Sequence, residues 1–385
     1  MSPPALERCV GNVDRFFECH WSRAPLVRAP EQDAGAFDDL ASLDDLDALI
    51  ASSALHASGL RMVRDGKSLP VSAYISGPGK GSRGGDPLVS SALVYERFSE
   101  GATIVLESLH RRWAPLADFC RELEVSLGHR LQVNAYITPP GARGFDVHID
   151  DHDVFVLQVS GAKHWFVYDR DDDGILLIDR EIARGTALYI PTGFPHAASA
   201  QAGASAHLTV GILTHDSMDV VREITRMAQE EPAFQERLPA GAATDPESLR
   251  SAVEGALTEL RVWLDKVDMD ELTLRVARRV MTTSQPIVRG QLRQSALAST
   301  IGQDTELVRR RGAVCILFRG QTSVTVLLSD RELELPAAAE DPLRFIAARE
   351  RFRVGDLHEL LTPESALVLA RRLVREGLLE VAVGR

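Results

Sequence analysis

The sequence predicts an α+β protein in which an antiparallel β-sandwich or barrel is followed by a helical segment and a small mixed unit. Three observations indicate this fold. Between residues 131 and 213, apolar residues alternate with a period of two in short segments that Gly, Pro and Asp separate. After His215 the apolar spacing changes to three and four residues, which is typical of helices. Beyond residue 286 a hairpin pattern and two helix-like runs follow.

Length and composition indicate the class of protein. The 385 residues suit two or three domains, and 45% hydrophobic with 25% charged residues is typical of a soluble globular protein. The first 30 residues lack a signal-peptide core and no window resembles a membrane span, which predicts a cytoplasmic protein without a membrane partner. The net charge of −12 disfavours nucleic acid and favours a basic partner.

The region before the strands has helical patterns. Ser42 is the expected N-cap of a helix that extends to His56, because aspartates occupy its first turn. Residues 102–127 carry apolar side chains at helical spacing, and we expect them to form the buried face of another helix. These side chains are Leu106, Leu109, Trp113, Leu116, Phe119 and Leu123.

The predicted strands are rich in β-branched and aromatic residues. They are 131–137, 154–159, 164–168, 187–190 and 206–213. Many short strands at this spacing favour an antiparallel sandwich or barrel over a parallel sheet. The mouth of such a barrel is a natural ligand pocket.

Two helical stripes follow the strands, at residues 220–228 and 249–267. The second stripe steps by three and four residues, which is the pattern of a helix-pairing seam. Pairing within one chain and pairing between two chains produce the same pattern.

The C-terminal segment predicts a hairpin around Arg319-Gly320-Gln321 and two helices, at 341–350 and 362–376. A hairpin with short helices suggests a winged-helix-like module. Arginines on the last helix are surrounded by acidic residues, so a packing or docking role is favoured over nucleic-acid binding. These arginines are Arg371, Arg372 and Arg375.

Residues 145–196 contain the candidate chemistry. His148 and Asp150 are two apart, so their side chains share one face of an extended segment, and His196 follows a later strand and turn. Two imidazoles and one carboxylate with open opposite positions are the ligand set of non-haem Fe(II) oxygenases. His152 is two residues beyond Asp150, so its side chain lies on the same face, and it is the alternative ligand or a substrate contact.

A second set of residues predicts a carboxylate site. Lys163 begins an otherwise apolar strand without an evident acidic partner, so a bound carboxylate is the candidate counter-charge. The alternative is a lysine at a sheet edge that reaches solvent. Asn134 and Tyr136 face the same way and are candidate hydrogen-bond partners of that carboxylate, or form a cross-strand polar pair. His207 and Thr209 line the pocket or support its residues.

These motifs resemble the JmjC-type cupin oxygenases, and within them the ribosomal oxygenase branch of Fe(II)- and 2-oxoglutarate-dependent protein hydroxylases. The resemblance rests on QVNAYITPPG at 132–141, HIDD at 148–151, DVFVLQ at 153–158, GAKHW at 161–165 and residues 185–196. It implies a double-stranded β-helix, or cupin jelly roll. The implied domains are a catalytic domain at 1–216 with a helical lead-in, a helical dimerisation domain at 217–286 and a winged-helix-like domain at 287–385.

The resemblance also implies residue roles. The implied Fe(II) ligands are His148, Asp150 and His196, and the implied 2-oxoglutarate contacts are Lys163, Asn134 and Tyr136. The implied protein is a homodimer that hydroxylates Arg or His of a basic protein or peptide, with a ribosomal protein as the favoured substrate. Three alternatives are a hydroxylase of a natural-product precursor peptide or small molecule, a methyl-lysine demethylase and a non-catalytic cupin binding module.

Overall fold

The structure is a computed structural model that describes residues 4–30, 37–52, 54–75, 85–142, 146–172, 174–200, 203–281 and 289–382. The chain forms two compact units, Met1–Thr214 and His215–Arg385. The predicted boundary between residues 286 and 287 lies outside the described residues, so a division of the second unit into two domains stays a prediction. In the described part of the chain, no helix is long and apolar enough to span a bilayer.

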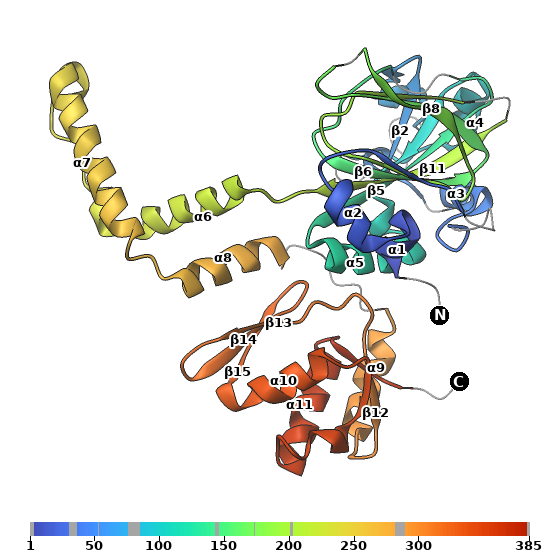
Figure 1. The fold of residues 1–385 in the computed structure, drawn as a ribbon. Coiled ribbons are helices and arrows are strands. Elements are labelled where there is room, and N and C mark those ends of the chain that lie inside the picture. The colour runs from blue at the N-terminus through green and yellow to red at the C-terminus, as the bar shows by residue number, and fades with distance from the viewer. Residues whose placement is uncertain are drawn as a thin grey trace. The chain divides into compact units, whose positions relative to one another are not determined.

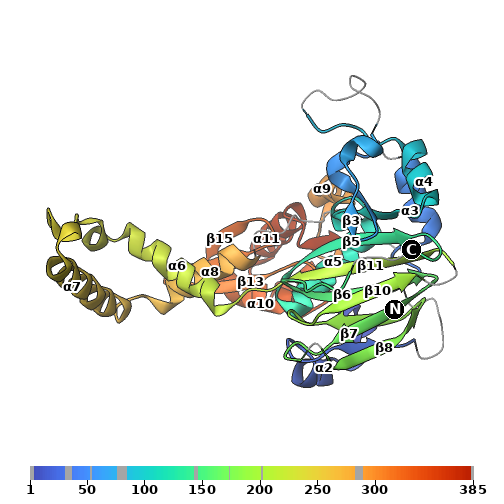
Figure 2. The same cartoon turned by 90° about the horizontal axis from the view of Figure 1, so that it is seen from above.

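The first unit contains a large and a small antiparallel sheet, with helices on the outer face of the large one (Figure 1). The large sheet has the strand order β1-β9-β6-β11-β5-β4-β2-β3, and the small sheet has the order β10-β7-β8. Seen from above, strands of the two sheets run alongside each other (Figure 2). This two-sheet arrangement confirms the predicted antiparallel sandwich.

The elements of this unit have the following bounds. The large-sheet strands are β1 (Leu26–Arg28), β2 (Leu60–Arg64), β3 (Lys67–Ser68), β4 (Thr103–Leu106), β5 (Arg130–Thr138), β6 (Asp153–Ser160), β9 (Ala187–Ile190) and β11 (Ser205–Leu213). The small-sheet strands are β7 (Ala162–Tyr168), β8 (Leu176–Ala183) and β10 (His196–Ala200). The helices are α1 (Ala5–Val10), α2 (Val13–Cys19), α3 (Leu43–Ser52), α4 (Ser91–Ser99) and α5 (Ala114–Leu127).

Strand β6 shows why the two sheets hold together. Phe155 and Leu157 pack into the apolar cluster shared with the helices, whereas Val154 and Val156 face the small sheet and contact the cluster of Trp165. Because alternate residues of a strand point to opposite faces, a strand buried on both faces must be apolar throughout. The large sheet is therefore a central layer, and the space between the sheets holds the candidate site.

The prediction of one helix over residues 102–127 is wrong in its first part. Residues Thr103–Leu106 form β4, which pairs with β2 and β5, and helix α5 begins only at Ala114. A short apolar run buried in a sheet has no periodicity that distinguishes it from a buried helix segment. The predicted cap of the earlier helix is confirmed, because Ser42 Oγ accepts a hydrogen bond from Asp45 N at 3.1 Å.

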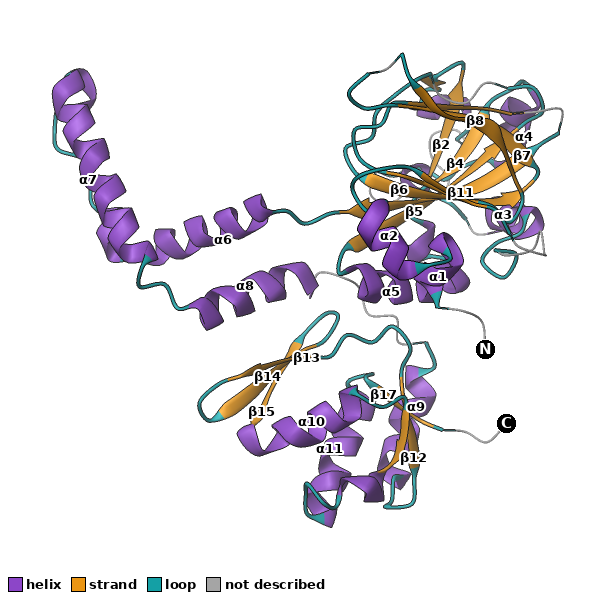
Figure 3. Cartoon of the chain, in the orientation of Figure 1, coloured by secondary structure: helices purple, strands orange, loops and turns teal. Residues whose placement is uncertain are grey.

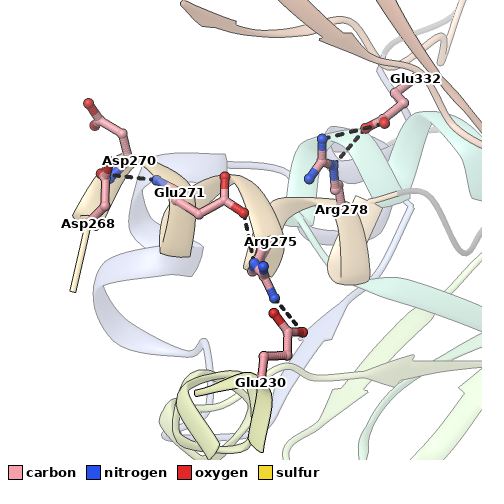
Figure 4. A network of polar contacts seen from close by, with 7 residues as sticks. All are labelled: Glu230, Asp268, Asp270, Glu271, Arg275, Arg278 and Glu332. Atoms are coloured by element: carbon pink, nitrogen blue, oxygen red, sulfur yellow. Dashed lines mark hydrogen bonds and ion pairs between the residues drawn. The ribbon is translucent and has the colours of Figure 1, made fainter. Parts of the chain in front are cut away.

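The second unit begins with three helices, of which the first two match the predicted stripes and the third was not predicted (Figure 3). These are α6 (Ser217–Glu230), α7 (Pro246–Leu264) and α8 (Met269–Met281). Arg275 of α8 joins α8 to α6, since its guanidinium contacts Glu230 at 2.9 Å and Glu271 at 2.8 Å (Figure 4). Arg278 contacts Glu332 of the C-terminal part at 2.6 Å.

The C-terminal part contains two small sheets, β16-β12-β17 and β13-β14-β15, around one apolar cluster. The predicted hairpin is confirmed, and the predicted last helix starts at its predicted cap, where Thr362 Oγ1 accepts from Ser365 N. The elements are α9 (Gln291–Leu297), β12 (Glu306–Arg309), β13 (Ile316–Arg319), β14 (Ser323–Leu327), β15 (Glu332–Pro336), α10 (Glu340–Ala347), β16 (Arg351–Arg353), α11 (Pro363–Arg375) and β17 (Leu379–Val381).

Candidate metal centre and cofactor pocket

A backbone bridge brings the two distant histidines of the predicted site together. His148 N donates to His196 O at 3.1 Å, and His196 N donates to His148 O at 2.9 Å. His196 is the first residue of β10, so the segment around His148 lies against the edge of the small sheet. Residues directly opposite in an antiparallel bridge project their side chains to the same face. The imidazole centroids are accordingly 4.4 Å apart.

Both imidazoles are oriented by backbone carbonyls. His148 Nδ1 lies 2.9 Å from Asp146 O, and His196 Nδ1 lies 2.9 Å from Phe194 O. A carbonyl can only accept, so Nδ1 carries the proton and Nε2 keeps its lone pair. Burial lowers the pKa of His196, which favours the neutral form further. This is the arrangement in which metal-binding histidines are usually held.

Asp150 completes the cluster. Its carboxylate oxygens lie 3.9 Å from His148 Nε2 and 3.6 Å from His196 Nε2. One ligand atom from each of the three residues lies within 4.8 Å of the other two. The His196 side chain is 5% exposed, whereas the His148 side chain is 40% exposed, so the cluster is open on one side. Two imidazoles and one carboxylate in this geometry can bind a divalent transition metal.

A pocket of about 210 Å³ extends from this cluster between the two sheets. Its walls come from five strands of the large sheet and two strands of the small sheet, together with the segment that holds His148 and Asp150. The lining residues are Arg61, Thr103, Tyr136, Thr138, His148, Asp150, Val154, Val156, Lys163, Trp165, His196, Ala198, His207 and Thr209. The pocket therefore combines a metal-binding cluster and a lysine with other polar side chains and with apolar walls from Val154, Val156 and Trp165.

Lys163 is the buried cation of the pocket. It lies on β7, the central strand of the small sheet, and is 3% exposed, so the sheet-edge alternative is wrong. Lys163 Nζ donates to Thr138 Oγ1 at 2.8 Å and lies 3.1 Å from His207 Nδ1. Among the described residues no carboxylate pairs with it. Burial lowers the pKa of Lys163 from 10.5 to about 7.

His207 and Tyr136 form the wall next to Lys163. Their rings stack at 5.0 Å with an interplanar angle of 2°, and the two residues face each other across β11 and β5. Burial, together with the charge of Lys163, lowers the pKa of His207 well below its ordinary value, so Nδ1 is a neutral acceptor for the ammonium. Burial raises the pKa of Tyr136, which keeps its phenol protonated as a donor.

Two predicted residues lie away from the pocket centre. Asn134 does not line the pocket, and its Oδ1 accepts from Ser108 N at 2.9 Å. Ser108 has φ 54°, a left-handed conformation that a non-glycine residue adopts only when its surroundings hold it. His152 is outside the metal cluster; it contacts Asp151 at 2.7 Å, and its ring leaves no space for a side chain at Gly211.

Sequence reasoning missed the pocket residues Arg61, Thr103, Thr138 and Trp165. Thr138 follows Tyr136 at the strand period, so alternation along β5 was a signal for it. Arg61 and Thr103 had no such signal, because they belong to β2 and β4, which were not predicted as strands. Arg61 contacts Glu107 at 3.1 Å, and Thr103 Oγ1 donates to Thr138 Oγ1 at 3.2 Å.

Comparison with protein families identifies this region. Residues 109–220 match the family model described as "JmjC domain". This segment of the chain is similar to JmjC domains. The three residues of the metal cluster and Lys163 all lie within the match, whereas the pocket residues Arg61 and Thr103 lie before it.

Curated proteins are similar to about half of this chain. Ribosomal oxygenase 1 of Gallus gallus is 30% identical over 222 residues, which are 53% of this chain and 35% of that protein. The bifunctional lysine-specific demethylase and histidyl-hydroxylase NO66 of Drosophila grimshawi is 26% identical over 225 residues, or 54% of this chain and 30% of that protein. The match thus spans about a third of the length of these relatives.

Solved structures extend the fold comparison beyond the JmjC domain. The ribosomal oxygenase YcfD from Escherichia coli aligns with a TM-score of 0.56 at 19% identity, covering 97% of this chain and 98% of that one. YcfD in complex with cobalt and 2-oxoglutarate aligns with a TM-score of 0.56 at 20% identity, covering 96% of this chain and 97% of that one. At 19–20% identity, this similarity shows that the proteins share a fold and nothing further.

Proposed function

We propose that this protein is an Fe(II)- and 2-oxoglutarate-dependent oxygenase that hydroxylates an arginine or histidine of a basic protein, with a ribosomal protein as the favoured substrate. One observation carries the proposal: a two-histidine, one-carboxylate cluster shares a pocket with a buried lysine that no described carboxylate neutralises. The JmjC match and the similarity to a ribosomal oxygenase and a histidyl-hydroxylase support it.

The donor set fits Fe(II). His148, Asp150 and His196 would hold the ion through the two Nε2 atoms and a carboxylate oxygen, which leaves positions open for a chelating cofactor. When bound with 2-oxoglutarate and dioxygen, Fe(II) supplies the oxidation of a substrate C–H bond to an alcohol, with release of succinate and carbon dioxide.

The protein's own residues would position the cofactor. The Lys163 ammonium would bind the carboxylate of 2-oxoglutarate remote from the metal, with Thr138 and Tyr136 as neighbouring donors. Asn134 remains a proposed contact, and only its amide NH₂ is available because Oδ1 is occupied by Ser108. Trp165, 5% exposed in the pocket wall, would exclude water.

Surface charge supports a basic substrate. Asp151, directly after Asp150, has a side chain that is 97% exposed. The turn after β7 contains Asp171, whose side chain is 87% exposed, and this turn is close to His196 because Tyr168 N donates to Pro195 O. Together with the net charge of −12, these carboxylates favour approach of a cationic polypeptide.

Turnover in the presence of candidate substrates tests the proposal. Purified protein loaded with Fe(II) should release succinate from 2-oxoglutarate under air, and release should rise when total ribosomal protein is added. Mass spectrometry should then find one added oxygen on an Arg or His. If the rate of succinate release did not change when ribosomal protein was added, a peptide or small molecule would be the favoured substrate. If the iron-loaded protein released no succinate, the proposed oxygenase activity would be wrong, and the alternative of a non-catalytic cupin binding module would be favoured.

The lowered pKa of Lys163 predicts proton uptake on cofactor binding. At about pH 8 most of the free protein has a neutral Lys163, and a bound carboxylate should protonate it; at about pH 6 it is already charged. Calorimetric titration of 2-oxoglutarate into the Mn(II)-loaded protein, in buffers of different ionisation enthalpy, should show uptake of up to about one proton only at the higher pH. Equal uptake at both values would contradict this.

The lowered pKa of Lys163 also makes the free energy of unfolding depend on pH in a defined direction. The unfolded chain, with the ordinary lysine pKa of 10.5, binds more protons than the folded chain above about pH 7. The contribution of Lys163 to the free energy of unfolding therefore rises as pH increases from about 7 to 10.5, and it falls as pH decreases through the folded pKa.

We further propose that residues 217–286 are a dimerisation domain. The α7 helix exposes an apolar stripe in which Leu249 is 36%, Val253 is 48% and Leu257 is 46% exposed. A sustained apolar stripe at helical spacing favours burial against a second copy. Residues 287–385 would be the winged-helix-like domain. On its last helix the Arg372 charge is balanced by Glu376, and the Arg371 guanidinium is held by Ile301 O.

Substitution on this stripe should dissociate the dimer. With Val253→Asp and Leu257→Asp together, we expect the dimer dissociation constant to rise by more than roughly 100-fold, because each buried apolar side chain contributes about 1.5–3 kcal/mol. Light scattering after size exclusion, over a range of concentrations, measures the mass. Ser251→Asp, on the opposite side of the same helix, is the matched control. A double variant with unchanged mass would contradict the proposed seam.

A further inference from the structure

Strand β15 is an edge strand with one open side. In the sheet β13-β14-β15 it pairs only with β14. Leu328 N donates to Arg331 O and Ala337 N donates to Thr322 O, so odd-numbered residues of β15 exchange hydrogen bonds with β14. The backbone groups of Glu332 and Glu334 therefore point away from β14. Both residues present N–H and C=O groups that another strand can pair with.

A groove of about 650 Å³ runs between this strand and helix α11. Its apolar walls include Leu335 and Leu361, which are partly buried, and Val368, which is 68% exposed. An exposed large apolar side chain beside an open strand edge is what strand-addition sites offer to the alternate side chains of a peptide.

The groove is acidic along its length. Three of its lining residues are the glutamates Glu332, Glu334 and Glu364, of which Glu332 is paired with Arg278 of α8 at 2.6 Å. The basic residue of the groove, Arg372, is paired with Glu376 at 2.7 Å, which leaves Glu334 and Glu364 as its unbalanced charges among the described residues. Glu332 and Glu334 lie on the strand face opposite to Leu333 and Leu335. A strand added beside β15 would thus meet apolar residues on one of its faces and carboxylates on the other.

We propose that this groove binds an extended polypeptide segment in which apolar residues alternate with Lys or Arg, by strand addition to β15. This site is separate from the metal centre and does not depend on the proposed oxygenase activity. Two copies of β15 are a poor match for each other, because their glutamates would face each other across the edge. Nucleic acid is disfavoured by the same carboxylates. A basic partner strand satisfies both the open backbone groups and the charge.

The test uses the full chain and a fluorescein-labelled peptide, acetyl-Gly-Val-Lys-Val-Arg-Val-Lys-Val-Gly-amide, followed by fluorescence anisotropy. Saturable binding is expected, together with slower hydrogen exchange at the amides of Glu332 and Glu334. The amides of Leu333 and Leu335, which already bond to β14, should change less. A peptide with Glu in place of Lys and Arg should bind at least roughly tenfold more weakly.

Two substitutions at Glu334 separate backbone pairing from charge. Glu334→Pro removes an N–H that does not bond to β14, so the sheet should fold, but binding should weaken about tenfold. Glu334→Gln keeps that N–H and should weaken binding by at most about fivefold. Val368→Ser removes exposed apolar surface from the groove without adding a charge and should weaken binding about tenfold, and Glu359→Gln, outside the groove, should leave it unchanged.

Each outcome decides the proposal. Absence of saturable binding, equal binding of the acidic peptide, or wild-type affinity in both Glu334→Pro and Val368→Ser would overturn it. Thermal melts accompany each variant, and a loss of affinity counts only where the melting temperature is retained. Protection at Glu332 and Glu334 in the wild-type chain is an independent readout, because it does not require any variant to fold.

Discussion

Replacing His148 by alanine is expected to abolish metal-dependent turnover. This substitution removes one of three ligand atoms that lie within 4.8 Å of one another and leaves two protein ligands for the ion. A loss of roughly 4 kcal/mol of metal-derived transition-state stabilisation corresponds to about a thousandfold fall in rate. Succinate release measures the rate, and anaerobic titration with Mn(II), followed by electron paramagnetic resonance, measures metal affinity directly.

His152→Ala is the matched control for His148→Ala. Both histidines lie in the same short segment, but His152 contacts Asp151 and lies outside the metal cluster. The control should retain Mn(II) affinity and turnover within about threefold, since it removes only an exposed pair. If His148→Ala bound the metal like the wild type, or if His152→Ala lost it, the assignment of the ligands would be wrong.

Replacing Lys163 by methionine is expected to raise the KM for 2-oxoglutarate by roughly 10- to 100-fold, because a hydrogen bond to a charged group contributes about 1.5–3 kcal/mol. The methionine fills a similar volume and carries no charge that must be buried. The melting temperature of the cofactor-free protein should therefore stay equal or rise, since burial of Lys163 already disfavours its charged form. Saturation curves of succinate release and thermal melts measure the two effects.

The second half of this prediction distinguishes a cofactor role from a structural one. A purely structural Lys163 would lower the melting temperature when replaced and leave the KM unchanged in the molecules that fold. Lys67→Met, at an exposed position on β3, is the control and should change neither quantity. A Lys163→Met protein with wild-type KM would exclude the lysine from cofactor binding.

Local patterns were sufficient for much of the fold. Strands β5, β6, β7, β9 and β11 were predicted from alternation, and the caps at Ser42 and Thr362 from side chains that satisfy free backbone amides. The errors fell where local signals are weak. β4 was assigned to a helix because its buried apolar run has no distinguishing period, and β8 and β10 were missed because neither alternates regularly between apolar and polar residues.

The site divides in the same way. Alternation alone put His148 and Asp150 on one face, and the lack of an acidic neighbour singled out Lys163. Asn134 and Tyr136 were equally plausible as pocket residues from their shared parity. The hydrogen bond from Ser108 N to the side-chain oxygen of Asn134 forms only because β4 and the turn after it pack beside β5. Likewise, Tyr136 stacks on His207 only because of the register between β5 and β11.

By itself, the sequence determined which residues are chemically able to bind a metal and a carboxylate, because that depends on residue type and on strand parity. The tertiary structure decided whether these side chains are positioned and protonated so that they can bind. The backbone bridge between His148 and His196, the carbonyls that fix both imidazoles and the burial that lowers the pKa of Lys163 all arise from neighbours distant in sequence. Orientation and solvation are properties of the surroundings of a side chain, and only the assembled sheets supply them.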